Sequence, residues 1–183
     1  PGIVRGVEDV ALEHGYHIAL GNYDVSPGKE EMYLSMFADR KVKGVVAAPS
    51  YNSQSEPYLA LVRAGIPLVL VDVRVPKVTA DLVSTDNIEG GRLAVEFLMR
   101  TGCTRIGFTC GGILTSSSQE RLAGYRRAIR EGGSSPKSSL VKGGEFTAAF
   151  GREAGRHLIR LGCDGIFVAN ETLTVGVMEA VRE

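Results

Sequence analysis

Three polar side chains in this sequence have the chemistry needed to hold a small polar molecule. Asp72 follows the apolar run Leu68–Val71, and its carboxylate can accept hydrogen bonds from two neighbouring hydroxyls of a sugar. Arg121 offers N–H donors in a rigid fork, and the amide of Asn170 both donates and accepts. Simpler roles stay open: a turn or cap for Asp72, a cap for Asn170, and a surface ion pair for Arg121. Position alone does not decide between these readings.

No catalytic or metal-binding constellation accompanies these residues. Cys110 also ends an apolar run, but His14, His17 and His157 all fall on predicted helices or strands, so it has no base. A buried structural thiol is therefore the better interpretation. The segment GGILTSSS, residues 111–118, could cradle an anion, but it lacks the Gly-Lys-Ser/Thr of a phosphate-binding loop. We expect no enzyme, no cofactor and no metal site.

The composition is that of a soluble globular protein with enough chain to bury a core. Hydrophobic residues make up 44% and charged residues 23% of the 183 positions, and 21 basic residues balance 21 acidic ones. That balance argues against a large nucleic-acid footprint on this chain and says nothing of an attached domain. Three scattered cysteines indicate a reducing, cytoplasmic location, and no apolar stretch approaches the length of a membrane span.

The elements that must position the polar residues follow a repeated order of helix, glycine, apolar strand and polar loop. The expected helices cover residues 1–14, a segment from Pro27 with Met32, Met36 and Phe37 on its apolar face, and residues 58–64, 87–100, 119–131, 147–161 and 173–183. The expected strands cover residues 16–20, 45–48, 68–71, 81–84, 105–110, 140–142 and 165–169. This alternation predicts an α/β fold with a mostly parallel sheet and helices on both faces.

The stretch Leu68–Leu98 is interpreted as a crossing between two lobes, formed by residues 1–82 and 83–183. Its first strand ends at Asp72, and its second leads into a helix that Asp86 can cap, with Glu89 closing a capping box. The pair Gly90-Gly91 allows another element to approach the first turn closely. Ligands of such folds bind beyond the carboxyl ends of the strands, so Asp72 should face the cleft between the lobes.

Several motifs extend this interpretation to a family. They are RGVEDVALEHGY (5–16), KVKGVVAAPS (41–50), GIPLVLVD (65–72), STDNIEGGRLAVEFLMRTGCTRIGF (84–108), ERLAGYRRAI (120–129), GIFVANE (165–171) and TVGVMEAV (174–181). In this order and spacing they resemble the effector-binding core of the LacI/GalR family of bacterial transcription regulators. The resemblance implies a type I periplasmic-binding-protein-like fold, with two Rossmann-like lobes that clamp a small ligand. It also implies a homodimer that reaches operator DNA through an N-terminal helix-turn-helix absent from this chain.

The resemblance also bears on individual residues. Family members place ligand contacts at the positions of Asp72, Arg121 and Asn170, and often an aromatic at the position of Phe146. Ser117, from the loop before Arg121, is a further candidate hydroxyl contact. The set suits a sugar, although relatives also use purines and nucleosides.

The sequence departs from the family pattern in several places. Gly102-Cys103 stands where Gly-His is usual, and Asn170-Glu171 where Asn-Asp is usual. By comparison with the family, we expect the first strand of the N-terminal lobe and the last strands of both lobes to be missing. The alternative function is a solute-binding protein of a sugar transporter, which shares the fold. A helix-turn-helix or a secretion signal at the full-length N-terminus would separate the two, and three unpaired cysteines favour the regulator.

Overall fold

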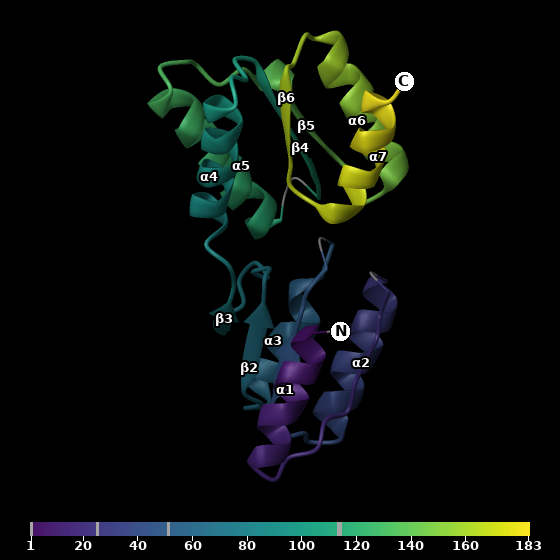
Figure 1. Cartoon of the computed structure of the whole chain (residues 1–183). Coiled ribbons are helices and arrows are strands. Elements are labelled where there is room, and N and C mark those ends of the chain that lie inside the picture. Colours follow the sequence, from purple (N-terminus) through teal and green to yellow (C-terminus); the bar gives the residue numbers. More distant parts are fainter. Residues whose placement is uncertain (1, 25, 51, 113–114) are drawn as a thin grey trace.

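A computed structural model of the chain describes residues 2–24, 26–50, 52–112 and 115–183. In these ranges the chain forms two parallel sheets of three strands, each with its own helices (Figure 1). The first lobe has strands β1 (Val45–Ala47), β2 (Leu68–Val71) and β3 (Asp81–Val83), in the order β1-β2-β3, with helices α1 (Gly2–Glu13), α2 (Pro27–Asp39) and α3 (Ser55–Arg63).

The second lobe repeats the plan around a central strand. Its sheet has the order β5-β4-β6, from β4 (Ile106–Gly111), β5 (Val141–Gly144) and β6 (Gly165–Val168). Its helices are α4 (Asn87–Arg100), α5 (Ser116–Glu131), α6 (Ala148–Arg160) and α7 (Glu171–Val181), with a short 3-10 turn at Ser138–Leu140. The parallel pairing in both lobes confirms the α/β fold with two parallel sheets.

Helix α4 begins and ends where the sequence predicts. Asp86 caps it, because its Oδ1 accepts a 2.9 Å hydrogen bond from the backbone N–H of Glu89. The expected capping box does not close, since the Glu89 carboxylate receives the guanidinium of Arg92 at 2.7 and 2.9 Å. A charged donor one turn away competes better for this carboxylate than a neutral backbone N–H.

The expected strand over residues 16–20 is wrong. The segment joins neither described sheet, and Tyr16, Ile18 and Leu20 expose 54%, 38% and 67% of their surfaces. Apolar alternation gives the segment strand propensity, but an extended chain becomes a strand only when a neighbour pairs with it. Within the described residues no neighbouring strand lies against it.

Two helices differ from expectation in detail. Helix α5 begins three residues before Gln119, because the Oγ1 of Thr115 accepts from the backbone N–H of Ser118 at 3.2 Å and caps the helix there. In α2, Met32 is exposed, whereas Glu30 and Leu34 are buried. The buried face of α2 is therefore rotated from the predicted one. The prediction relied on hydropathy, which assigns a charged residue such as Glu30 to the solvent-exposed face.

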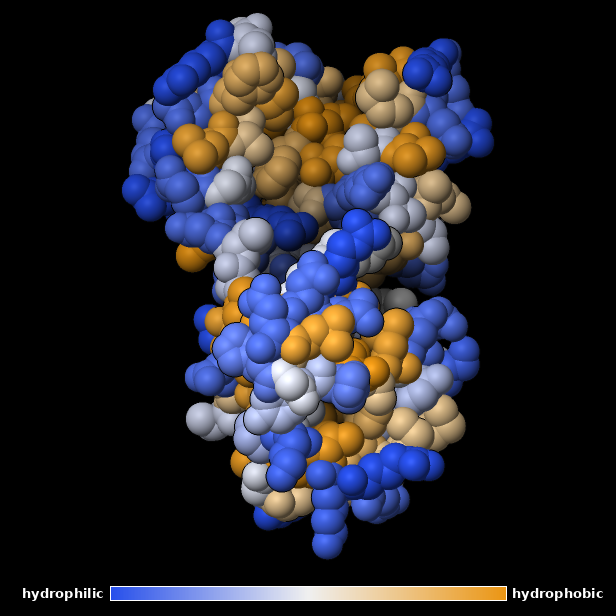
Figure 2. Space-filling model, turned by 60° about the horizontal axis from the view of Figure 1, so that its bottom comes forward, coloured by the Kyte–Doolittle hydropathy of each residue, from blue (hydrophilic) through white to orange (hydrophobic). Residues whose placement is uncertain are grey.

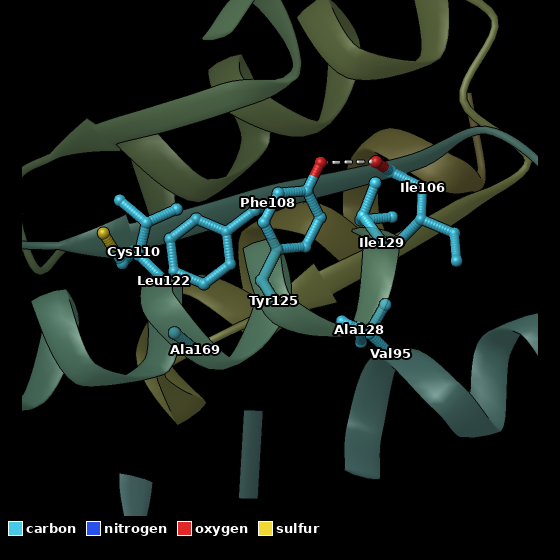
Figure 3. Packing of buried hydrophobic residues seen from close by; sticks show 9 residues of the cluster. All are labelled: Val95, Ile106, Phe108, Cys110, Leu122, Tyr125, Ala128, Ile129 and Ala169. Carbon is cyan, nitrogen blue, oxygen red and sulfur yellow. Dashed lines mark hydrogen bonds between the residues drawn. The ribbon is translucent and has the colours of Figure 1, made fainter. Parts of the chain in front are cut away.

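The core of the second lobe lies between β4 and the pair α4 and α5 (Figure 3). Every residue of β4 is buried, as expected for a central parallel strand. The ring of Phe108 lies 5.4 Å from that of Tyr125, whose hydroxyl donates a 2.9 Å hydrogen bond to the carbonyl of Ile106. Helix α5 is thus fixed to the sheet by both apolar and polar contact, which sets the direction of its amino-terminal end.

Helices α4 and α5 pack backbone to backbone at glycines. A Cβ atom on Gly91 would lie 2.6 Å from the carbonyl oxygen of Arg121, and one on Gly124 would collide with the backbone of Ile88. This confirms the close approach predicted for the Gly90-Gly91 pair, at its second member. The backbone of Arg121 is therefore held directly against the first turns of α4.

The first lobe has a smaller core around Tyr58, Leu61 and Leu70. Helix α1 adds no buried residue to it. Apolar side chains accordingly remain on the surface of the molecule, seen as orange areas on both lobes in Figure 2.

The lobes are joined by the chain between β3 and α4 and, among the described residues, by a hydrogen bond between backbone and side chain. The backbone N–H of Arg74 donates to the Oγ of Ser116 at 2.9 Å. Figure 1 shows the end of β4 and the loop after β1 directed toward the opposite lobe. The domain boundary between residues 82 and 83 stays a prediction, and β3 itself extends to Val83.

Candidate ligand-binding site

Asp72 stands alone at the end of β2. Its backbone N–H donates to the carbonyl of Val83 at 2.9 Å, and its φ of 66° places it in the left-handed region, which aspartate tolerates better than most residues. Its carboxylate caps no helix and has no hydrogen-bond partner among the described residues. A half-buried carboxylate in a turn is thus left with its acceptor capacity unused.

Arg121 is held by neutral acceptors instead of an ion pair. Its Nε donates to the Oδ1 of Asn87 at 2.9 Å, and one terminal nitrogen donates to the carbonyl of Ala169. In the described part of the chain no carboxylate lies within ion-pair distance of it. The surface-salt-bridge alternative is therefore wrong for this residue, and the other terminal nitrogen keeps its donors.

Asn170 is a helix cap, as one of its two interpretations predicts. Its Oδ1 accepts from the backbone N–H of Leu173 at 3.3 Å, and its carbonyl accepts from the Oγ1 of Thr174 at 2.9 Å. The amide nitrogen has no partner in the ranges described. A cap that uses the oxygen leaves the nitrogen able to donate, so the cap does not conflict with a ligand contact.

Phe146 lies between β5 and α6 with its ring over Gly111. A Cβ atom at Gly111 would approach the Cγ of Phe146 to 2.6 Å, so only glycine at this strand end leaves room for the ring. The aromatic face is thereby placed at the carboxyl end of β4. This contact is packing against the strand, and a ligand contact of Phe146 stays a prediction.

Ser117 does not lie in a loop, contrary to expectation. It is buried in the first turn of α5, and its neighbour Ser116 makes the contact with the other lobe. The sequence missed this because the cap at Thr115 starts the helix early. The anion-cradle hypothesis for residues 111–118 includes residues 113 and 114, which lie outside the described residues.

Four of the five candidates, Arg121, Asn170, Phe146 and Ser117, come from the second lobe. Arg121 binds the carbonyl of Ala169, the residue before Asn170. Phe146 covers Gly111, whose carbonyl accepts from the Oγ of Ser118 at 2.8 Å. Asp72 comes from the first lobe, two residues before the Arg74 contact with α5. The Arg74 contact thus holds the segment after β2 against the first turn of α5, the helix that carries Arg121.

Glu30, which was not singled out from the sequence, is a buried carboxylate that holds the loop at the end of β1 in the first lobe. The Oε1 of Glu30 accepts from the hydroxyl of Tyr58 at 2.5 Å and from the Oγ of Ser53 at 2.7 Å, and Ser53 in turn accepts from the backbone N–H of Ser50 at 2.8 Å. Burial, followed by Glu30, raises the pKa of Tyr58. Glu30 therefore anchors the loop after β1, and no hydropathy pattern marks a buried glutamate.

Tyr23 makes a second connection to the end of β1. Its hydroxyl donates to the carbonyl of Ala48, and burial, followed by the charge of Glu30, raises its pKa to about 12. The tyrosine is accordingly a neutral donor near neutral pH.

Other chemistries find no support in the described residues. Cys110 is buried, and burial raises its pKa to about 11, which fits a structural thiol; Cys103 and Cys163 are free as well. The described residues contain no group of three or more His, Cys, Asp or Glu side chains placed to hold a metal ion. In the same ranges, every helix is too short or too polar to traverse a bilayer. Open surface hollows lie along α2, at Met32, Met36 and Arg40, and along α7, at Glu171, Val175 and Met178.

A family model described as a periplasmic binding protein domain matches residues 2–183. The chain belongs to this family. Among sequence relatives, the HTH-type transcriptional regulator DegA of Bacillus subtilis is 28% identical over 98% of this chain and 54% of DegA. The ribose operon repressor of Halalkalibacterium halodurans is 30% identical over 100% of this chain and 53% of the repressor. The chain thus spans about half the length of the curated relatives it matches.

Solved structures of regulators share the fold of this domain. The transcription regulator CcpA of Lactococcus lactis superposes with a TM-score of 0.89 at 26% identity, covering 98% of this chain and 66% of CcpA. The complex of the transcriptional regulator CelR with cellobiose gives 0.86 at 31% identity, covering 99% of this chain and 56% of CelR. The type I periplasmic-binding-protein-like fold and the resemblance to LacI/GalR-type regulators are both confirmed.

Proposed function

We propose that this domain is the ligand-sensing part of a cytoplasmic, DNA-binding transcription regulator that binds a sugar between its two lobes. The observation that carries the proposal is the unused carboxylate of Asp72 on the first lobe, two residues before the Arg74 contact with α5, the helix that carries Arg121. These side chains offer acceptors from one lobe and donors from the other, and sugar hydroxyls satisfy both. Phe146 adds an apolar face for the sugar ring.

The sugar class is supported by what the relatives are called. One is a ribose operon repressor, and another is a regulator solved with cellobiose. Both match this domain along nearly its full length, so ribose and cellobiose are the first two probes to use. A purine nucleoside is the third, because its ribose and base present similar groups.

The mechanism follows from a site shared between lobes. A ligand that contacts both lobes binds the closed arrangement better than the open one and so shifts the population toward it. In a homodimer carrying an N-terminal helix-turn-helix, that shift would change the distance between the DNA-reading helices and hence operator affinity. The proposal does not require chemistry at the site, and the named relatives are regulators.

Calorimetry on the full-length protein with D-ribose, cellobiose and adenosine tests the proposal. Asp72→Asn keeps the left-handed backbone and removes the charge, and Arg121→Ala removes the fork. Each should weaken binding about tenfold or more, as expected when a charged hydrogen bond is lost. Arg130→Ala, on the exposed side of α5, is the matched control and should bind like wild type.

Two outcomes would contradict the proposal. Wild-type affinity in either site variant would remove that residue from the site. Tight sugar binding that leaves operator binding unchanged in a gel-shift assay would favour the solute-binding alternative instead.

A further inference from the structure

Asn87 is a buried amide at the start of α4, inside the motif of residues 84–108, for which the sequence suggested no role of its own. Only 4% of its surface is exposed, so it lies out of reach of a ligand. Both polar atoms of its side chain nevertheless make hydrogen bonds. The Oδ1 accepts from the Nε of Arg121 at 2.9 Å and from the Oγ1 of Thr85 at 3.2 Å, and the Nδ2 donates to the Oε2 of Glu120 at 3.0 Å.

This arrangement fixes one edge of the Arg121 guanidinium. The Nε bond to Asn87 and the terminal-nitrogen bond to Ala169 lie on neighbouring nitrogens, so together they set both the position and the plane of the fork. Without Asn87 the side chain would hold a single anchor and could rotate about it. A buried polar partner with good geometry lowers the cost of ordering a long side chain before a ligand arrives.

Asn87 also belongs to the segment that joins the lobes. Residues 84–86 connect β3 of the first lobe to α4 of the second, and Thr85 binds Asn87 twice. Its Oγ1 donates to the Asn87 side chain, and its carbonyl accepts from the Asn87 backbone N–H at 2.9 Å. A change in the direction of this segment would therefore act on the same oxygen that holds Arg121.

We propose that Asn87 is a positioning residue that fixes the Arg121 guanidinium and ties it to the segment joining the two lobes. The proposal deepens the function proposed above and rests on it for the role of Arg121 toward a sugar. Asn87 itself does not touch the ligand. It couples the angle between the lobes to the geometry of the fork, through one amide oxygen shared by Thr85 and Arg121.

Three variants separate the two halves of the Asn87 side chain. Asn87→Leu removes the acceptor and the donor. Asn87→Asp keeps the acceptor for Arg121 but places a second carboxylate beside Glu120. The double variant Asn87→Asp/Glu120→Gln restores both hydrogen bonds with the amide and the carboxylate exchanged between the two positions. Glu120→Gln alone is the control, because its amide oxygen still accepts from Asn87.

The first readout needs no ligand. In ¹⁵N NMR spectra of the full-length protein, the Nε–H of Arg121 should give a resolved resonance that exchanges slowly with water. Asn87→Leu should broaden or abolish that resonance, while the double variant and the Glu120→Gln control should retain it. An unchanged Arg121 resonance in Asn87→Leu would overturn the proposal. Loss of that resonance in a double variant that unfolds at the wild-type temperature would overturn it as well.

The second readout is affinity for D-ribose and cellobiose by calorimetry. Asn87→Leu should weaken binding of whichever sugar wild type binds by about tenfold. The double variant should bind that sugar within about threefold of the wild-type affinity. The unfolding temperatures of the variants should not follow the same order as their affinities. Equal losses in Asn87→Leu and the double variant would contradict a role through Arg121. If wild type binds neither sugar, the proposed ligand class fails, and the NMR arm alone still decides whether Asn87 positions Arg121.

Discussion

The backbone N–H of Arg74 donates a 2.9 Å hydrogen bond to the Oγ of Ser116, joining the segment after β2 to the first turn of α5. Ser116→Ala removes the acceptor and leaves the backbone donor to water. Because the site is partly exposed, the change in unfolding free energy should stay at about 1 kcal/mol or less. Hydrogen exchange at the amide of Arg74 should become faster.

Ser134→Ala, in the exposed turn after α5, is the control for this substitution and should leave that amide unaffected. Unchanged protection of Arg74 in Ser116→Ala would mean that the two lobes do not meet at this bond in solution.

Adjacent glycines of α4 should respond in opposite directions to alanine. Nothing lies within 4 Å of a Cβ at Gly90, so Gly90→Ala should stabilise the helix by roughly 0.5–1 kcal/mol. Gly91→Ala places a methyl against the backbone of Arg121 and should destabilise by about 1–3 kcal/mol. Denaturant unfolding of both variants measures the difference. Similar values for the two would show that α4 and α5 do not approach as closely as described.

Replacing the buried carboxylate of Glu30 should be costly. Glu30→Ala leaves the hydroxyls of Tyr58 and Ser53 without their acceptor in a buried place, which should lower the unfolding free energy by about 2 kcal/mol or more. Glu30→Gln keeps an acceptor oxygen and should lose less. The exposed neighbour Glu31 provides the matched control as Glu31→Ala, which should unfold like wild type. A loss of unfolding free energy in Glu30→Ala no larger than that in Glu31→Ala would mean that Glu30 is exposed to solvent.

Stability should fall with rising pH in the alkaline range. Burial raises the pKa of Cys110 from 9.0 to about 11, and burial with the Glu30 charge raises that of Tyr23 from 10.0 to about 12. The unfolded chain therefore loses these protons first, so the stabilisation is complete below about pH 9 and is lost as pH rises toward about 12. Urea unfolding across this range measures it.

Variants assign the alkaline loss to its groups. Cys110→Ala should remove the fall in unfolding free energy that begins near pH 9. Tyr23→Phe should remove the fall that begins near pH 10. A stability that is level with pH up to about 12 would contradict both raised values.

Much of the fold could be predicted because its local signals agree with its packing. Helix α4 was predicted with its bounds, since Asp86 caps it and its apolar residues recur at helical spacing. The strand over residues 16–20 could not be judged from its own residues, because pairing depends on a neighbour. The start of α5 was missed because a cap at Thr115 outweighed the loop-like composition of the serines that follow it.

The candidate site was predictable only in part. Asp72 and Asn170 follow apolar runs visible in the sequence, whereas Arg121 was named from the family resemblance, and the ligand contacts of all three stay predictions. Asn87 and Glu30 could not, because buried polar residues are chosen by partners that are distant in the chain: Arg121 lies 34 residues from Asn87, and Tyr58 lies 28 residues from Glu30.

The cap at Asn170 gives the proposed site a polarity. Its oxygen is committed to α7, so what Asn170 offers a ligand is N–H, as Arg121 also does, whereas Asp72 offers only lone pairs. In the proposed site, the second lobe would donate hydrogen bonds to acceptors of the ligand, and Asp72 of the first lobe would accept hydrogen bonds from its donors. A sugar hydroxyl replaced by an ether oxygen keeps its acceptor and loses its donor, so it should be tolerated at the second lobe and rejected at Asp72.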